Sequence, residues 1–462
     1  MKLKRSHTII LGSITCLFLV LWIVCTKLIE WRGGGIPKLV WNKSGPNVSK
    51  LKEQRKTDAI KSSGISLSNH GNATNPYWSN FRGPNGEGIY TEQPILTDWP
   101  KEGPPLLWRK LIGGGHSSFS IANGLAFTLE QQAGNEIISA FSVETGVAQW
   151  AHKYNAKFEE YFGGIGPRTT PAWDDGRLFA LGAKGHLHCL DAKSGELFWE
   201  KNLMTENEAE VPYWGVSASP FIYKDTVIIT PGGNAENAIV ALKKKTGEKV
   251  WSVLSGVQTY STPTLFNLLG KEQLIVSMKE TMSAINPDNG KLLWSHPWKI
   301  FTNNYNIAQP TQLTDDIVLV SAGYGTGAEA FRIINEGGFM HTESLWKSKS
   351  LKTKFSSPIF WGGHLYGLNE NRLVCLDAKD GSLRWRGDKY GYGQLIAASG
   401  HLIILGDAGD LVLVEMNPSK FVEKANFKAL QGGRTWNYPA LANGLLFVRN
   451  SYEMACFDVR KK

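Results

Sequence analysis

Short apolar runs separated by turns rich in Gly, Asp and Asn recur along most of this chain. Examples are Arg177–Gly182 (RLFALG) and Val227–Thr230 (VIIT). Runs that are this short and bounded by turns predict strands buried between neighbouring sheets. Segments such as Asp191–Gly195 supply the tight turns, in which Gly can adopt a positive φ.

The runs belong to an internal repeat, in which a small residue precedes a Gly by six positions and a Trp by ten. Complete copies are Ala140/Gly146/Trp150, Cys189/Gly195/Trp199, Ala241/Gly247/Trp251, Ala284/Gly290/Trp294 and Cys375/Gly381/Trp385. Inner strands begin at Pro171, Pro220, Pro263, Pro310, Pro358 and Pro439, with equivalents near Ser117 and Gln394. Eight such units predict the blades of a propeller. We expect each Trp ring to lie against the small residue of the neighbouring blade, where a larger side chain would collide.

The two ends of the repeat predict that the ring closes. The last unit stops at Ala455–Asp458 without a Trp strand, and the orphan strand Leu106–Arg109 precedes the first unit. Closure by this N-terminal strand removes exposed sheet edges. The predicted fold is therefore all-β, an eight-bladed β-propeller over residues 106–460. Its docking rings would be Trp108, Trp150, Trp199, Trp251, Trp294 and Trp385.

The residues before the propeller divide into four segments. Residues 1–7 are short and basic, and residues 8–28 contain an uncharged run from Thr8 to Thr26, which is long enough for a transmembrane anchor or a signal segment. Bulky residues at the end of this run and the absence of a small-x-small site favour an uncleaved single-pass anchor. Residues 29–75 are predicted to be a flexible basic linker, and residues 76–105 a lead-in segment.

The net charge of +9 does not indicate a nucleic-acid partner. Residues 1–75 hold 12 Lys and Arg against three acidic residues, and the rest of the chain holds 38 of each sign. The basic character therefore belongs to the tail, and the predicted propeller is neutral. A nucleic-acid-binding propeller is disfavoured.

The spacing of small residue, Gly and Trp resembles the tryptophan docking motif of the PQQ-repeat (pyrroloquinoline quinone-binding-like, quinoprotein-like) propeller family. The segment Trp78–Gly88 (WSNFRGPNGEG) is similar to the lead-in of a bacterial family of exported propellers. The resemblance implies a periplasmic or extracytoplasmic propeller on a membrane segment at residues 8–28. The architecture is also similar to that of the outer-membrane barrel assembly lipoprotein, which implies a scaffold role, although no lipid-attachment Cys fits here.

The same resemblance raises the alternative of a PQQ-dependent dehydrogenase acting on an alcohol or a sugar. Such enzymes carry adjacent cysteines, a calcium site and a catalytic Asp. Here Cys189, Cys375 and Cys456 occupy the small-residue position of separate repeats, and no two cysteines are adjacent. No set of catalytic or metal-ligating residues stands out. We expect no cofactor, with PQQ and calcium as the alternative.

Aromatic and basic residues precede most inner strands, at positions that would gather round one mouth of the channel. The candidate ligand-binding residues are His116, Arg168, Trp214, Tyr260, Asn306, Lys354, Tyr392 and Trp436. Such a set suits a protein, peptide or saccharide ligand. The competing interpretation is that several of these side chains only pack the tops of the blades. The predicted function is a non-catalytic, membrane-tethered binding or assembly scaffold at the cell envelope.

Overall fold

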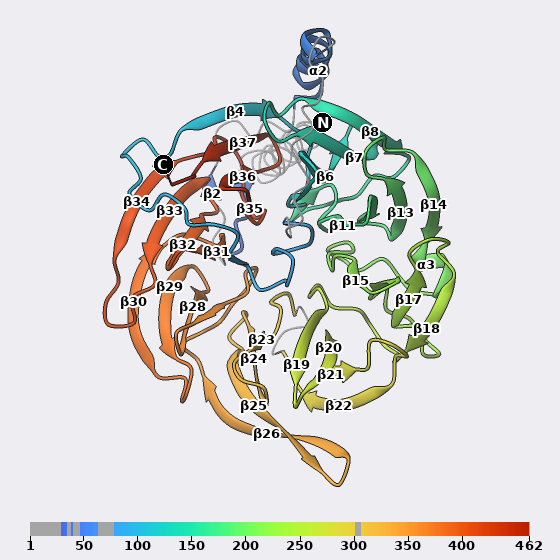
Figure 1. Cartoon of the computed structure of the whole chain (residues 1–462), viewed down its shortest axis with the longest axis vertical. Coiled ribbons are helices and arrows are strands. Elements are labelled where there is room, and N and C mark those ends of the chain that lie inside the picture. Colours follow the sequence, from blue (N-terminus) through green and yellow to red (C-terminus); the bar gives the residue numbers. More distant parts are fainter. Residues whose placement is uncertain (1–28, 35–37, 40–46, 63–77, 301–305, 462) are drawn as a thin grey trace, which may run out of the picture.

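The computed structural model describes residues 29–34, 38–39, 47–62, 78–300 and 306–461. Within these ranges, eight sheets, each built round antiparallel strands, stand around a central channel (Figure 1). Seven of the described sheets have four strands, and the seventh blade along the chain gains a fifth strand. The prediction of an eight-bladed propeller is therefore confirmed.

The strands of each blade run outward from the channel in chain order, except for the outermost strand of the eighth blade. The first two blades are β5 (Ser120–Ala122), β6 (Leu125–Gln132), β7 (Asn135–Ser142), β8 (Ala148–Tyr154), and β11 (Ala172–Asp174), β12 (Arg177–Leu181), β13 (His186–Asp191), β14 (Leu197–Asn202). The next two are β15 (Phe221–Tyr223), β16 (Thr226–Ile229), β17 (Ile239–Lys243), β18 (Lys249–Val253), and β19 (Thr264–Leu268), β20 (Lys271–Ser277), β21 (Thr281–Ile285), β22 (Leu292–Pro297). The fifth and sixth are β23 (Thr311–Gln312), β24 (Ile317–Ala322), β25 (Gly327–Glu336), β26 (Phe339–Ser348), and β27 (Ile359–Trp361), β28 (His364–Asn369), β29 (Arg372–Asp377), β30 (Leu383–Lys389). The last two are β31 (Gln394–Ala398), β32 (His401–Leu405), β33 (Asp410–Glu415), β34 (Glu423–Lys428), and β35 (Ala440–Ala442), β36 (Leu445–Arg449), β37 (Glu453–Asp458) with β4 (Leu106–Leu111).

The ring closes through the N-terminal strand, as predicted. Strand β4 pairs antiparallel with β37, with Trp108 opposite Cys456. Because β4 is the outer strand of the eighth blade, both ends of the repeat share one sheet, and unfolding at either end breaks that sheet.

Consecutive blades are joined by a contact between an indole and a glycine. A Cβ added at Gly146 would lie 2.6 Å from the ring of Trp108, and one at Gly195 would lie 2.6 Å from the ring of Trp150. The Trp108 Nε1 donates to the carbonyl oxygen of Val143 at 2.8 Å. The same bond from indole Nε1 to a carbonyl in the next blade recurs at Trp150–Ala192, Trp199–Lys244, Trp251–Pro287, Trp346–Ala378 and Trp385–Asn417.

The expected partner of the ring requires a correction. The small residue that lies opposite Trp150 across the sheet is Ala140 of the same blade. The ring extends beyond this partner and lies on the turn of the next blade, where Gly is required because any side chain would collide with the ring. Trp294 differs, since its Nε1 donates to Gln273 of its own blade at 2.7 Å, and the fifth blade lacks the Gly of the repeat.

The lead-in segment crosses the channel. The carbonyl oxygens of Trp78 and Ser79 accept from the amides of Ile121 and Trp173, in the first and second blades. The Arg82 guanidinium donates to Gln309 Oε1 at 3.1 Å, and β3 (Ile89–Tyr90) pairs in parallel with β31. The segment therefore connects blades on opposite sides of the ring and blocks one end of the channel.

Part of the segment predicted to be a flexible linker is helical. Helix α2 (Val48–Ser62) lies on the outer edge of the ring (Figure 1). Its Arg55 contacts Glu130 at 2.5 Å, its Asp58 pairs with Lys110 of β4 at 2.7 Å, and Leu51 is buried. These partners are distant in the sequence, so local composition alone could not indicate them. The remaining described elements are α3 (Leu203–Glu206), β1 (Ile29–Glu30), β2 (Lys38–Leu39), β9 (Glu159–Glu160) and β10 (Gly164–Ile165).

The predicted transmembrane or signal segment at residues 8–28 lies outside the described residues. In the part of the chain that the structure describes, no helix has the length and apolar character needed to cross a membrane.

We expect Trp108→Ala to lower the free energy of unfolding by about 3–5 kcal/mol, because it removes a large buried ring from the closing blade. Trp108 is 7% exposed, whereas Trp361 is 43% exposed and makes a matched control. Urea unfolding followed by circular dichroism measures both variants. Equal, small losses in the two variants would contradict the docking role of Trp108.

Candidate binding site at the mouth of the channel

A cavity of about 140 Å³ lies in the central channel. Its wall includes Phe81 of the lead-in and Trp31, which comes from the segment before the propeller. Five of the eight predicted site residues line this cavity together: His116, Arg168, Trp214, Tyr260 and Trp436. They come from loops that precede inner strands in different blades, as the repeat predicts.

The other three predicted residues are placed differently. Lys354 and Tyr392 lie beside the cavity, with the Lys354 Nζ 4.9 Å from the centroid of the Tyr392 ring. Asn306 is buried, donates to Ser277 Oγ at 2.5 Å, and accepts the Tyr260 amide at its carbonyl oxygen. Asn306 is not among the residues that line the cavity; it holds the loop that carries Tyr260.

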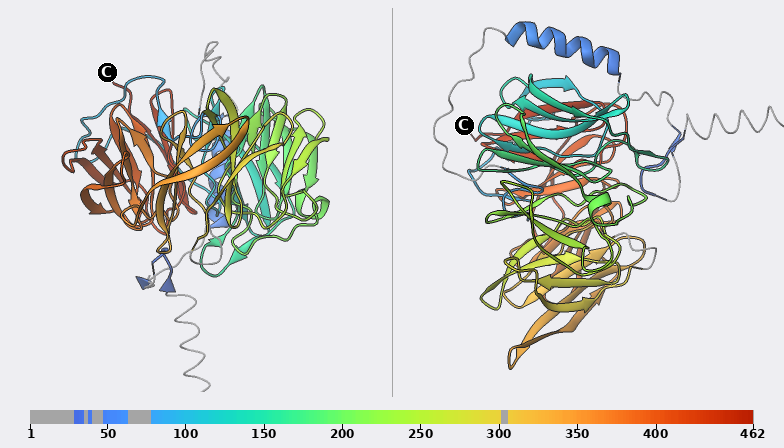
Figure 2. Two further views of the ribbon diagram at one scale, coloured as in Figure 1. Left: turned by 90° about the horizontal axis from the view of Figure 1, so that it is seen from below. Right: turned by 90° about the vertical axis from the view of Figure 1, so that its right-hand side faces the viewer.

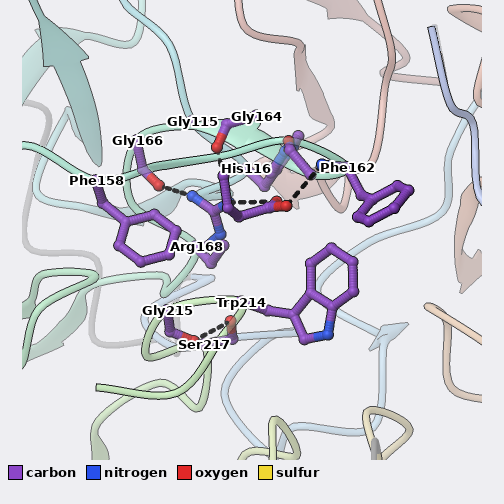
Figure 3. A network of polar contacts seen from close by, with 12 residues as sticks. Gly115, His116, Phe158, Phe162, Gly164, Gly166, Arg168, Trp214, Gly215 and Ser217 are labelled. Atoms are coloured by element: carbon purple, nitrogen blue, oxygen red, sulfur yellow. Dashed lines mark hydrogen bonds and ion pairs between the residues drawn. The ribbon is translucent and has the colours of Figure 1, made fainter. Parts of the chain in front are cut away.

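The Arg168 side chain makes its polar contacts with the loop from which it projects (Figure 3). Its guanidinium donates to the carbonyl oxygens of Gly164 and Gly166, pairs with Glu160 at 3.2 Å, and lies 4.5 Å above the Phe158 ring. Burial lowers the pKa of Arg168 to about 10, so the side chain is charged at neutral pH. The sequence suggested that a charge at the mouth would be available for a ligand, but the hydrogen bonds of Arg168 are directed to residues 160–166.

His116 is a neutral side chain in the cavity wall. Its Nε2 lies 2.7 Å from the Gly163 carbonyl oxygen, so this nitrogen carries the proton and Nδ1 is an acceptor. Burial, together with the charges of Arg168 and Arg434, holds the pKa of His116 well below its usual value. Among the described residues, neither His116 Nδ1 nor Trp436 Nε1 has a hydrogen-bond partner. Gln394, which also lines the cavity, has an Oε1 without a described partner, so the lining residues carry two acceptors and one donor, which suits an amide or a hydroxyl group.

Several residues of the mouth were not predicted from the sequence. Phe355 and Tyr324 were missed, although Phe355 directly follows Lys354 and precedes the sixth inner strand. Arg434 was also missed, two positions before Trp436. The register that identified Lys354 and Trp436 could have found Phe355 and Arg434. Trp31 carried no such signal, because it belongs to a segment without repeat character.

The Trp31 ring is inserted among aromatic residues of the mouth. It stacks on Trp214 with ring centroids 6.3 Å apart, and it meets Phe162, Phe355 and Trp436 edge-on at 5.5, 6.5 and 6.1 Å. Strands β1 and β2, which flank this segment, lie beyond one flat face of the disc (Figure 2, left). The chain therefore covers its own mouth with residues that precede the propeller.

The residues of the mouth do not fit a calcium-dependent quinone site. The carboxylate in the cavity wall is that of Glu160, and it is paired with Arg168. Within the ranges described, no three His, Cys, Asp or Glu side chains are grouped to hold a metal ion. Cys189, Cys375 and Cys456 are buried in three separate blades, and burial raises the pKa of each thiol. The cavity wall therefore supplies one carboxylate, which is already paired, whereas a calcium ion takes about six to eight oxygen ligands, carboxylates prominent among them.

The fold and the docking contacts define a PQQ-like repeat propeller whose mouth is lined by aromatic residues. The family model described as "Outer membrane protein assembly factor BamB" matches residues 134–387, more than half of the chain, and the chain belongs to this family.

Among curated relatives, the outer membrane protein assembly factor BamB of Shewanella oneidensis is 20% identical over 66% of this chain and 78% of its own length. The quinoprotein alcohol dehydrogenase PedH of Pseudomonas putida is 22% identical over 57% of this chain, which spans 45% of that enzyme.

Solved structures share the fold. The BamB structure from Moraxella catarrhalis has a TM-score of 0.55 at 13% identity, and the match covers 77% of this chain and 99% of that one. The quinohemoprotein alcohol dehydrogenase from Comamonas testosteroni has a TM-score of 0.59 at 12% identity, covering 89% and 85%. At these identities the likeness concerns the fold alone.

The low pKa of His116 predicts a pH dependence of stability. The folded chain keeps this ring neutral, whereas the unfolded chain protonates it below a pH of about 6.5. Stability that depends on the neutral ring is therefore lost as the pH falls through this value. Between pH 6.5 and 5, the free energy of unfolding should fall by up to about 2 kcal/mol more in the unmodified chain than in His116→Gln. Urea unfolding at both pH values measures the difference. If the free energy of unfolding fell equally with pH in both proteins, the neutral state of His116 in the folded chain would be contradicted.

Proposed function

We propose that this chain is a non-catalytic scaffold of the cell envelope that binds a segment of another protein at the mouth of its channel. The observation that carries the proposal is the composition of the mouth, in which aromatic rings surround cations that donate to main-chain carbonyl oxygens. Arg434 donates to the carbonyl oxygens of Trp31 and Phe162, and Lys354 donates to that of Gly33. Donors directed at main-chain carbonyls suit a peptide better than a saccharide.

The membrane attachment is part of the same proposal. Trp31 follows the predicted anchor at residues 8–28 by only a few residues. An anchor there would hold the mouth against the surface of the membrane, with the propeller on the exported side. The family description and the names of the BamB relatives support a role in the assembly of outer membrane proteins.

The assembly role is tested by complementation. In cells that lack the chain, we expect Trp214→Ala/Trp436→Ala to leave the amount of folded outer-membrane β-barrel protein at the level of the deletion strain, because the variant lacks two rings of the mouth. The control is Phe339→Ala, at a residue that is 84% exposed on the projecting β25–β26 hairpin. A role of the mouth in assembly would be contradicted if both variants, present in the cells in equal amounts, restored the folded β-barrel protein to the same level.

The match to PedH makes a PQQ-dependent alcohol dehydrogenase the second candidate function. Titration of the full chain with PQQ and calcium, followed by absorbance and thermal midpoint, separates the two. We expect no saturable shift below about 10 µM, because the carboxylate of the mouth is already paired with Arg168. A saturable shift, followed by alcohol oxidation with an artificial acceptor, would support the enzyme and contradict the scaffold.

A further inference from the structure

Residues 30–34 occupy the mouth as a bound peptide would. The aromatic side chain of Trp31 is inserted among four rings from the loops that precede the second, third, sixth and eighth blades. Arg434 Nη1 donates to the Trp31 carbonyl oxygen at 2.8 Å, and Lys354 Nζ donates to the Gly33 carbonyl oxygen at 2.5 Å. One side-chain anchor and two main-chain contacts are the elements of peptide recognition.

Lys354 is positioned to donate a hydrogen bond to a main-chain carbonyl oxygen of a bound peptide. Its side chain is 8% exposed, and its Nζ lies 4.2 Å from the Tyr324 centroid and 5.4 Å from the Trp31 centroid. A buried ammonium group needs hydrogen-bond acceptors, and aromatic faces offset only part of its desolvation. The carbonyl oxygen of Gly33 supplies such an acceptor, and burial still lowers the pKa of Lys354.

The two glycines of the segment differ in what they tolerate. Gly33 has φ +89°, and a Cβ there would lie 2.8 Å from both Phe355 and Tyr392. At Gly34, a Cβ would meet Tyr392 at 3.6 Å, which is ordinary van der Waals contact. The mouth therefore requires Gly at position 33 and accepts a side chain at position 34.

The residue between Trp31 and Gly33 contributes less to recognition. Arg32 pairs with Glu30 of the same segment at 2.7 Å. The sequence requirement that the mouth imposes on a bound peptide is therefore Trp, any residue, and then a Gly at which the chain bends.

We propose that the mouth is a receptor for segments of other proteins that have the pattern Trp-x-Gly and bend at the Gly, and that residues 30–34 are its internal ligand. The internal ligand keeps the mouth closed until a segment of the same chemistry displaces it. This inference rests on the proposed function and names the class of its partner. Because the internal segment belongs to the same chain, its effective concentration at the mouth is on the order of 1 mM, and a free peptide competes poorly until that segment is weakened.

The test uses the full chain in detergent and a fluorescein-labelled peptide with the sequence of residues 29–34 (IEWRGG), followed by fluorescence anisotropy. We expect Trp31→Ala to bind this peptide at least about tenfold more tightly than the unmodified chain, because the internal ligand has lost its anchor. The double variant Trp31→Ala/Trp436→Ala should lose this increase in affinity, because it lacks one of the rings that contact the peptide. Equal affinity of Trp31→Ala and the unmodified chain would overturn the internal-ligand part of the proposal.

Peptide variants test recognition without any further change to the protein. Bound to the Trp31→Ala chain, a peptide with Gly33→Ala should lose at least about tenfold in affinity, whereas one with Gly34→Ala should bind as the parent does. Equal affinities of the two variants would overturn the Trp-x-Gly requirement.

Two further outcomes are distinguishable. If light scattering shows that the unmodified chain is a dimer and that Trp31→Ala converts it to a monomer, the occupant is a second copy of this chain and the partner proposal is overturned. If the peptide binds as expected but mouth variants still rescue outer-membrane protein levels, the receptor stands and the assembly function fails.

Discussion

The stacking of a tryptophan on the glycine turn of the next blade is the contact on which the rest of this structure depends. It fixes the spacing and rotation of successive blades, since the ring fills the space that a side chain on that turn would need. Repeated along the chain and completed by Trp108 on β4, it converts an open array into a closed ring. Only a closed ring brings the loops that precede the first, second, third, fourth, sixth and eighth blades to one mouth.

The channel inside this ring is occupied by chain from outside the repeat. The lead-in crosses one end, with Arg82 hydrogen-bonded between blades, and Trp31 covers the mouth at the other. The lead-in and the Trp31 segment both cover aromatic and cationic side chains of the loops, which would otherwise be exposed to water. The propeller therefore resembles a scaffold whose recognition surface is already filled by its own chain.

The sequence predicted those parts of the structure that repeat. Eight inner strands, the closing strand and the positions of Trp150 and Trp251 follow from spacing alone, because a repeated unit meets the same neighbours each time. The repeat also placed His116, Trp214 and Trp436 near one opening. It could not indicate that Arg168 would direct its hydrogen bonds to its own loop, because that depends on the local path of residues 160–166. Trp31 and helix α2 were missed because their partners, such as Trp214 and Glu130, are far away in the sequence.

The most direct test of the account is the environment of Trp31 in the full chain. Fluorine NMR of protein labelled with 5-fluorotryptophan gives this residue its own signal, assigned by its loss in Trp31→Phe. We predict that the chemical shift of this signal differs from that of a solvent-exposed fluorotryptophan. When excess IEWRGG peptide is added, the chemical shift should move to the solvent-exposed value. The account would be contradicted if the chemical shift had the solvent-exposed value before peptide was added. It would also be contradicted if saturating peptide left the chemical shift unchanged, because an internal ligand at the mouth should be displaced.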